Sequence, residues 1–207
     1  MIKNCKIKNS DFFLLGLMYA RGNFLGKREK TIAIYFTFDE VELADNIKKI
    51  IPEYISQKII KISKHKKIHA IYFPSRMGEK MKETFKIDKQ TISDRKLTKA
   101  ILLGEEDKAK DFISGIMCIN VSIKTKGFLF WKKKIFEFKE QSIEFLEYIG
   151  NFLKKSDIPF TIKDNSKNSV FFGSKKIPQI SFLTIKEEHF KKLNDKIYFA
   201  NPKINII

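Results

Sequence analysis

A helix-like segment occurs twice in this chain of 207 residues, about half a chain apart. The first copy is Asp11-Phe-Phe-Leu-Leu-Gly-Leu-Met-Tyr-Ala-Arg-Gly-Asn-Phe24, and the second is Asp111-Phe-Ile-Ser-Gly-Ile-Met-Cys-Ile-Asn-Val-Ser-Ile123. Gly16 aligns with Gly115 between the two copies. A repeat at this spacing predicts two similar halves, each built around one such helix.

The residues after each copy predict the same order of elements in both halves. Alternating apolar and polar residues indicate strands, and apolar stripes at helical spacing indicate helices. The first half is expected to hold strands at 23–28 and 31–38, a helix at 39–51, strands at 57–63 and 67–73, and a helix at 78–85. The second half is expected to hold a helix at 108–118, strands at 120–126 and 128–138, a helix at 142–154, paired strands at 160–163 and 170–172, a sheet extension at 180–183, and a helix at 187–193.

This pattern predicts an α+β fold with a duplicated αββαββα unit. The first repeat is expected over residues 1–90 and the second over residues 108–207, with residues 91–107 as a polar linker. Because 43% of the residues are hydrophobic, the chain can bury a sizeable core as one domain or as two small ones.

Small residues in both copies suggest that the two repeated helices pack against each other. Gly16 and Ala20 lie one helical turn apart, as do Ser114 and Cys118, which flank Gly115. Small side chains at this spacing allow two helix backbones to approach closely. An ordinary buried helix that contains glycine is the alternative explanation for either copy taken alone.

The two copies resemble the signature helix of the LAGLIDADG homing-endonuclease family. The matching stretches are Leu14-Leu-Gly-Leu-Met-Tyr-Ala-Arg-Gly22 and Ile113-Ser-Gly-Ile-Met-Cys-Ile-Asn-Val121. The resemblance covers nearly the whole chain and implies a pseudo-twofold monomer with two antiparallel, saddle-shaped sheets over a DNA major groove. It also implies an acidic residue near the end of each signature helix, which would hold a divalent metal ion beside the scissile phosphate.

At those two positions this chain has Arg21 and Asn120. Arginine has a permanent positive charge and no acceptor, and asparagine offers only a neutral carbonyl oxygen. Hard divalent cations prefer anionic oxygen ligands, so we expect vestigial catalytic positions, no metal and no other cofactor. His65 and His69 flank a predicted turn, whose geometry does not suit a metal site.

The charge of the chain indicates an anionic partner. Lysine and arginine number 41 against 24 acidic residues, which gives a formal net charge of +17. A field of this sign attracts polyanions, and nucleic acid is the commonest large polyanion in a cell. No apolar run approaches the roughly 20 residues needed to span a bilayer, and two cysteines suit a reducing compartment. We therefore expect a cytoplasmic protein that does not enter membranes.

Alternation along the strands nominates the residues of a nucleic-acid-binding face. Phosphate contacts and base-edge hydrogen bonds both need polar or basic side chains, and we expect such a face on each sheet. A solvated sheet face is the alternative. The candidates are Asn23, Lys27, Arg28, Tyr35, Lys61, Ser122, Lys124, Lys126 and Lys163.

The function predicted from these features is binding of nucleic acid without cleavage, with duplex DNA as the preferred ligand. A maturase-like, RNA-binding splicing cofactor is the first alternative. The others are a metal-dependent endonuclease with displaced ligands and a scaffold that contacts another protein.

Overall fold

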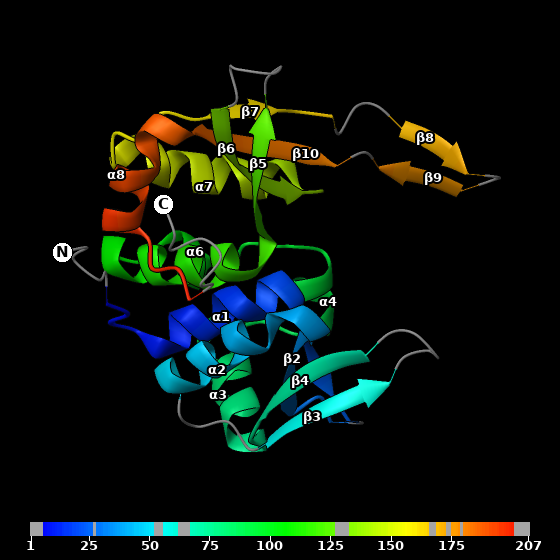
Figure 1. Cartoon of the computed structure of the whole chain (residues 1–207). Coiled ribbons are helices and arrows are strands. Elements are labelled where there is room, and N and C mark those ends of the chain that lie inside the picture. Colours follow the sequence, from blue (N-terminus) through cyan, green and yellow to red (C-terminus); the bar gives the residue numbers. More distant parts are fainter. Residues whose placement is uncertain are drawn as a thin grey trace. The chain divides into compact units, whose positions relative to one another are not determined.

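The computed structural model describes most of the chain, and its helices and strands are labelled in Figure 1. For residues 38, 56–61, 67, 169–172 and 175–178 it describes the backbone alone. The described residues are 6–26, 28–51, 56–61, 67–126, 133–165, 169–172, 175–178 and 180–200. No helix among them is long and apolar enough to cross a membrane.

The first signature helix is followed by a four-stranded antiparallel sheet. Its strands are β1 (Gly22–Leu25), β2 (Thr31–Thr37), β3 (Ser56–Lys61) and β4 (Lys67–Phe73), in the order β1-β2-β4-β3. Its helices are α1 (Ser10–Arg21), the 3-10 turn η1 (Phe38–Glu40), α2 (Val41–Ile50) and α3 (Ser75–Phe85). Each of these four strands was predicted from alternation to within a few residues.

The core of this part forms because one face of β2 is apolar. Ile32, Ile34 and Phe36 alternate along the strand and are almost completely buried. They lie against α1, α2 and α3, because alternate residues of a strand point to the same side. Phe12 and Phe85 join α1 to α3 by an edge-to-face contact with ring centroids 4.9 Å apart.

The segment expected to be a polar linker contains two short helices, α4 (Lys89–Ser93) and α5 (Lys99–Leu102). Asp88 caps α4 by accepting a hydrogen bond from the backbone N–H of Thr91, and the Thr91 bonds hold the pKa of Asp88 below its ordinary value. Ile92 and Ile101 are buried, so this segment contributes side chains to the core and is not merely an exposed connection. Tyr19 of α1 also donates a hydrogen bond to the backbone carbonyl of Lys96.

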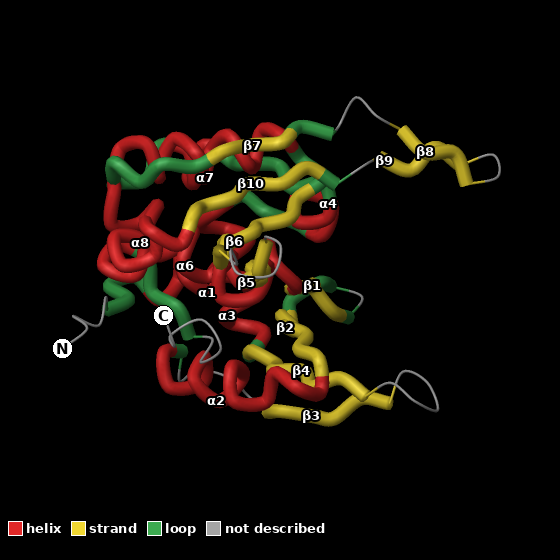
Figure 2. Tube along the Cα trace, turned by 45° about the horizontal axis from the view of Figure 1, so that its top comes forward, coloured by secondary structure: helices red, strands yellow, loops and turns green. Residues whose placement is uncertain are grey.

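The second signature helix also leads into a four-stranded antiparallel sheet. Its strands are β5 (Val121–Lys126), β6 (Lys133–Glu140), β7 (Thr161–Lys163) and β10 (Ser181–Lys186), in the order β5-β6-β10-β7. Its helices are α6 (Glu106–Asn120), α7 (Ile143–Lys155), the 3-10 turn η2 (Glu187–His189) and α8 (Phe190–Lys196). Figure 2 shows α7 along one face of this sheet.

The predicted pairing of 160–163 with 170–172 is wrong. Strand β7 pairs with β10, whereas β8 (Ser169–Phe172) pairs with β9 (Lys175–Pro178) in a separate two-stranded sheet. The prediction treated every strand signal after β7 as part of the main sheet. The β8–β9 hairpin instead lies within the connection between β7 and β10, and β10 occupies the central place that β4 has in the first sheet.

The described residues form two compact units, and the division falls between Ile119 and Asn120. The N-terminal unit contains residues 6–119 and 197–200, and therefore holds α1, nearly all of α6 and the first sheet. The C-terminal unit contains residues 120–196 and holds the second sheet with α7 and α8.

Within the N-terminal unit, α1 and α6 lie side by side (Figure 1). A Cβ atom on Gly16 would lie 2.0 Å from the carbonyl oxygen of Phe112, and one on Gly115 would lie 2.2 Å from that of Phe13. Both distances are far shorter than van der Waals contact, so only glycine fits at either position. Ala20, the other small residue of α1 nominated for this packing, is buried as well.

The two small polar residues of α6 contact the C-terminal segment of the same unit. Ser114 Oγ accepts a hydrogen bond of 3.0 Å from the backbone N–H of Tyr198. The Cys118 Sγ atom accepts one of 3.2 Å from the backbone N–H of Ala200. These two side chains therefore fasten residues 198–200 to α6.

Candidate nucleic-acid interface

The end of α1 carries an ion pair at the position where the resemblance implies a metal-binding acid. The Arg21 guanidinium lies 2.6 Å from Glu40 Oε2, and the two side chains are 33% and 15% exposed. The same Glu40 oxygen accepts a hydrogen bond of 2.7 Å from the backbone N–H of Thr37, which completes a capping box. The positive charge of Arg21 is therefore balanced by Glu40. The Glu40 carboxylate is in turn used by this ion pair and by the capping box.

Asn120 is the last residue of α6 and is partly buried. Its side chain supplies a neutral oxygen, and position 21 supplies a cation in contact with a carboxylate. Among the described residues, no group of three or more histidine, cysteine, aspartate or glutamate side chains could hold a metal ion. Neither Arg21 nor Asn120 supplies the anionic oxygen ligand that a divalent cation prefers.

The outer face of the second sheet, opposite α7, is rich in lysine. The register aligns Ser122 with Glu137 and Thr184, and it aligns Lys124 with Ile135 and Lys186. Directly paired residues share a face, so one set of side chains runs across all four strands. We call this surface the lysine face; its lysines are Lys124, Lys126, Lys133, Lys139, Lys163 and Lys186.

The opposite face of this sheet explains why the lysines point outward. Phe136, Phe138, Leu183 and Ile185 alternate with them along β6 and β10 and are almost completely buried. The Phe136 ring meets Phe190 of α8 edge to face, with centroids 5.9 Å apart. Exposing any of these side chains would cost about 1.5–3 kcal/mol, so the register of the sheet is strongly determined.

Glu137 is the one acidic residue on the lysine face as the structure describes it. Its side chain is only 6% exposed, and its Oε1 atom lies 2.6 Å from the Lys124 Nζ atom and 3.9 Å from that of Lys139. These two lysines are therefore partly neutralised. Within the described ranges, Lys126, Lys133, Lys163 and Lys186 have no ion pair and are exposed.

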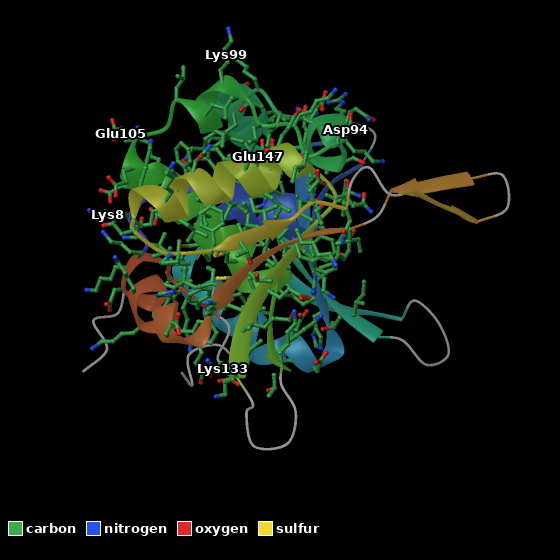
Figure 3. The ribbon with its side chains drawn as sticks, turned by 90° about the horizontal axis from the view of Figure 1, so that it is seen from above. Lys8, Asp94, Lys99, Glu105, Lys133 and Glu147 are labelled. Carbon is green, nitrogen blue, oxygen red and sulfur yellow. The ribbon has the colours of Figure 1, made fainter. Side chains whose placement is uncertain are left out.

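The lysine face ends in a shallow cavity of about 620 Å³. Lys126 and Lys133 lie directly opposite each other there, and Figure 3 labels Lys133 at the start of β6. Like charges placed directly across a strand pair destabilise a sheet unless an anion lies between them. The cavity is lined by Lys126, Lys133, Lys134, Ile135, Lys186, Glu187 and Glu188.

The corresponding face of the first sheet has a different chemistry. The register places Tyr35 opposite Ala70, and Tyr72 opposite Ala33, on the two central strands. Partial burial, and to a smaller extent the neighbouring Tyr72, raises the pKa of Tyr35. We call this surface the tyrosine face; its described side chains are Asn23, Leu25, Thr31, Ala33, Tyr35, Thr37, Ile68, Ala70 and Tyr72.

None of the described side chains on the tyrosine face is charged, whereas we predicted a basic face on each sheet. The basic residues predicted for this sheet include Lys27 and Lys61, whose side chains lie outside the described residues. On β2 and β4, however, the outward positions hold alanine, threonine, isoleucine and tyrosine. A basic surface is thus present on the second sheet. On the first sheet the described side chains of β1, β2 and β4 are uncharged, and the side chains of β3, where Lys58 pairs with Ala70, lie outside the described residues.

Comparisons with solved structures identify the architecture. The meganuclease I-SmaMI, bound to uncleavable DNA, matches with a TM-score of 0.56 and 11% identity over 98% of this chain and 87% of its own. The homing endonuclease I-DmoI, in complex with DNA and manganese, matches with a TM-score of 0.52 and 13% identity over 91% of this chain and 95% of its own. The chain has the LAGLIDADG homing-endonuclease fold.

A third structure with the LAGLIDADG-like fold is full-length DUF199/WhiA from Thermatoga maritima. It matches with a TM-score of 0.54 and 15% identity over 98% of this chain, which spans 60% of that protein. No family model matches the sequence, and the comparison with curated proteins finds no match.

Within the LAGLIDADG fold, most of the nominated interface residues lie on the outer sheet faces. Asn23 and Tyr35 are on the tyrosine face, and Arg28 is exposed in the turn after β1. Lys27 lies outside the described residues, as does the side chain of Lys61, whose backbone pairs with Lys67. The remaining four are on the lysine face: Ser122, Lys124, Lys126 and Lys163.

Sequence reasoning missed three lysines of this face, which are Lys133, Lys139 and Lys186. The signal for the first two was present, because both occur an even number of residues from Glu137 and out of phase with Phe136 and Phe138. Lys186 could not be placed, because the central position of β10 in the sheet was not foreseen.

Proposed function

We propose that this chain binds duplex DNA and does not cut it. The lysine face carries the proposal, because six lysines and one buried glutamate cover one surface of a four-stranded sheet. An antiparallel sheet of this kind suits a nucleic-acid groove, and lysines beside it bind phosphates. The DNA-bound forms of I-DmoI and I-SmaMI, which have the same fold, support this choice of ligand.

The absence of cleavage follows from the two vestigial positions. Metal-assisted hydrolysis of a phosphodiester needs anionic ligands that hold the cation beside the scissile phosphate. Arg21 is a cation already paired with Glu40, and Asn120 has no charge. Binding therefore does not require magnesium.

We further propose that the chain acts as a monomer, because its duplication already supplies two sheets.

The proposal is tested by titrating labelled duplex DNA and labelled structured RNA with the whole protein over a range of salt concentrations. Each phosphate contact contributes about −0.9 to the slope of log affinity against log salt, so four unpaired lysines predict a slope of about −3.6 or steeper on duplex DNA. The slope and affinity should be the same with magnesium as with a chelator.

Three outcomes would contradict this proposal. Tighter binding to structured RNA would favour the splicing-cofactor alternative. Weak binding to both ligands at low salt would favour a scaffold for protein contacts. Chelator-sensitive nicking of a plasmid that follows the protein through a second purification column would show that the chain is an endonuclease.

A further inference from the structure

The tyrosine face offers apolar surface and one amide group where the lysine face offers charge. Ala33 and Ala70 have no exposed surface, and each lies directly across a strand pair from a partly exposed tyrosine. The two tyrosines occupy diagonal positions on β2 and β4, a separation that aromatic side chains can bridge. The two alanines are covered, so the rings of Tyr35 and Tyr72 form the accessible apolar surface at the centre of this face.

Asn23 lies at one edge of this apolar surface. It pairs with Ala33, which in turn pairs with Tyr72, so the three residues form one row across β1, β2 and β4. Asn23 is partly exposed, and its amide makes no hydrogen bond to the part of the chain that the structure describes. An amide with both a donor and an acceptor is therefore presented next to apolar side chains.

The DNA major groove presents one apolar group, the C5-methyl of thymine, and it presents adenine as an adjacent donor and acceptor pair. An asparagine amide binds that pair with two hydrogen bonds, and alanine or aromatic side chains contact the methyl group. Guanine is read chiefly by arginine or lysine, and cytosine by an acidic side chain. The described side chains of β1, β2 and β4 on the tyrosine face include none of these three. The side chain of Lys58 on β3, whose backbone pairs with Ala70, lies outside the described residues.

We infer that the tyrosine face reads A·T base pairs in one half of the bound duplex, with Asn23 contacting adenine and the apolar surface contacting thymine methyl groups. This inference rests on the proposed function. It assigns base discrimination to the N-terminal unit and most of the phosphate binding to the C-terminal unit.

The test is selection of binding sites from a random-sequence duplex library by the whole protein in magnesium-free buffer. The selected motif should be richer in A·T pairs in one half than in the other. Replacing one of those pairs with G·C should weaken binding by about 5- to 100-fold.

Variants of Asn23 test whether the tyrosine face determines the selected base sequence. Asn23→Arg should change the preferred base at one position from adenine to guanine, and Asn23→Gln should keep adenine, because each side chain matches that base with two hydrogen bonds. Tyr35→Phe, which keeps the ring, should preserve the motif, whereas Tyr35→Ala should relax it. Lys126→Gln is the control, since it should weaken binding to all sequences and leave the motif unchanged.

Failure of the inference is separable from failure of the proposed function. No salt-dependent binding to any duplex would refute both. Binding without a selected motif, a motif with equal A·T content in its halves, or a motif that Asn23→Arg leaves unchanged in a folded variant would overturn the inference alone. Tighter binding to structured RNA would also overturn it, because side chains do not reach into the deep, narrow major groove of RNA.

Discussion

The two sheets have corresponding strand orders and very different outer faces. In both, a hairpin after the signature helix pairs with a second strand pair, giving the orders β1-β2-β4-β3 and β5-β6-β10-β7. The inner faces are alike because alternate apolar residues, such as Ile34 on β2 and Phe138 on β6, are buried under helices. The outer faces do not determine the topology, so they can differ: the described side chains of one are rich in lysine, and those of the other include tyrosine and alanine.

The comparison also extends to the helices. The N-terminal unit holds the close packing of α1 against α6, where a backbone carbonyl occupies the space beside each glycine. In the C-terminal unit, Gly150 of α7 faces the ring of Phe160, and an added Cβ would lie 2.8 Å from two ring atoms. The carbonyl groups beside Gly16 and Gly115 belong to helix backbones and are fixed, whereas the side chain of Phe160 beside Gly150 can rotate.

The largest expected effect follows from this contrast in helix packing. Gly16→Ala should destabilise the protein by about 3 kcal/mol, at the upper end of overpacking costs, because the Phe112 carbonyl cannot move without its helix. Gly150→Ala should cost less than about 1 kcal/mol, because the Phe160 ring can move aside and alanine favours a helix. Urea unfolding of the two variants measures the difference. Equal losses of stability would mean that the two glycines are not distinguished by their neighbours.

The second prediction separates the two faces by their dependence on salt. Replacing Lys126, Lys133 and Lys186 with glutamine should weaken duplex binding on the order of 100-fold and reduce the salt slope by about 2.7, or 0.9 for each lost phosphate contact. Tyr35→Ala combined with Asn23→Ala should leave the slope unchanged, because neither residue is charged. Titrations at several salt concentrations measure both quantities.

A charge-matched control accompanies the triple variant. Lys154, Lys155 and Lys191 are exposed on α7 and α8 of the same unit, and their replacement by glutamine removes the same total charge. This control should lose far less affinity than the lysine-face variant. Similar losses for both would show that net charge, rather than the sheet face, attracts the ligand.

The smallest expected effect concerns the buried acid of the lysine face. Glu137→Gln should release Lys124 and Lys139 from their ion pairs, so duplex binding should tighten by about threefold and the salt slope should become steeper. The tyrosine face has no counterpart to this residue among its described side chains. Weaker binding by a folded Glu137→Gln protein would indicate that Glu137 instead holds the two lysines in position.

The elements that could be predicted from the sequence were those whose pattern is local. Ile32, Ile34 and Phe36 mark β2 by alternation alone, and the apolar stripe of Leu43, Ala44 and Ile47 marks the helix that follows it. The resemblance of the two glycine-containing helices also led to the correct fold. Each of these signals lies within a few residues of the chain.

The features that could not be predicted depend on residues that are far apart in sequence. In the order β5-β6-β10-β7, strand β10 pairs with β6 and β7 although the β8–β9 hairpin separates it from β7 in sequence. No local sequence pattern indicates this pairing. The ion pair of Arg21 with Glu40 joins the end of a helix to a capping box beyond two strands. The sequence showed that position 21 carries a permanent positive charge, and only the folded structure shows its partner.

The Arg21–Glu40 pair also limits how the chain can change by single substitutions. An aspartate at position 21 would place two carboxylates together at a partly buried site and would leave the capping glutamate without its cation. Each step from this protein toward an acidic helix end therefore passes through a less stable intermediate unless position 40 changes as well. Among related sequences, an acid at position 21 should accompany a neutral or basic residue at position 40, so the two positions should be inherited together.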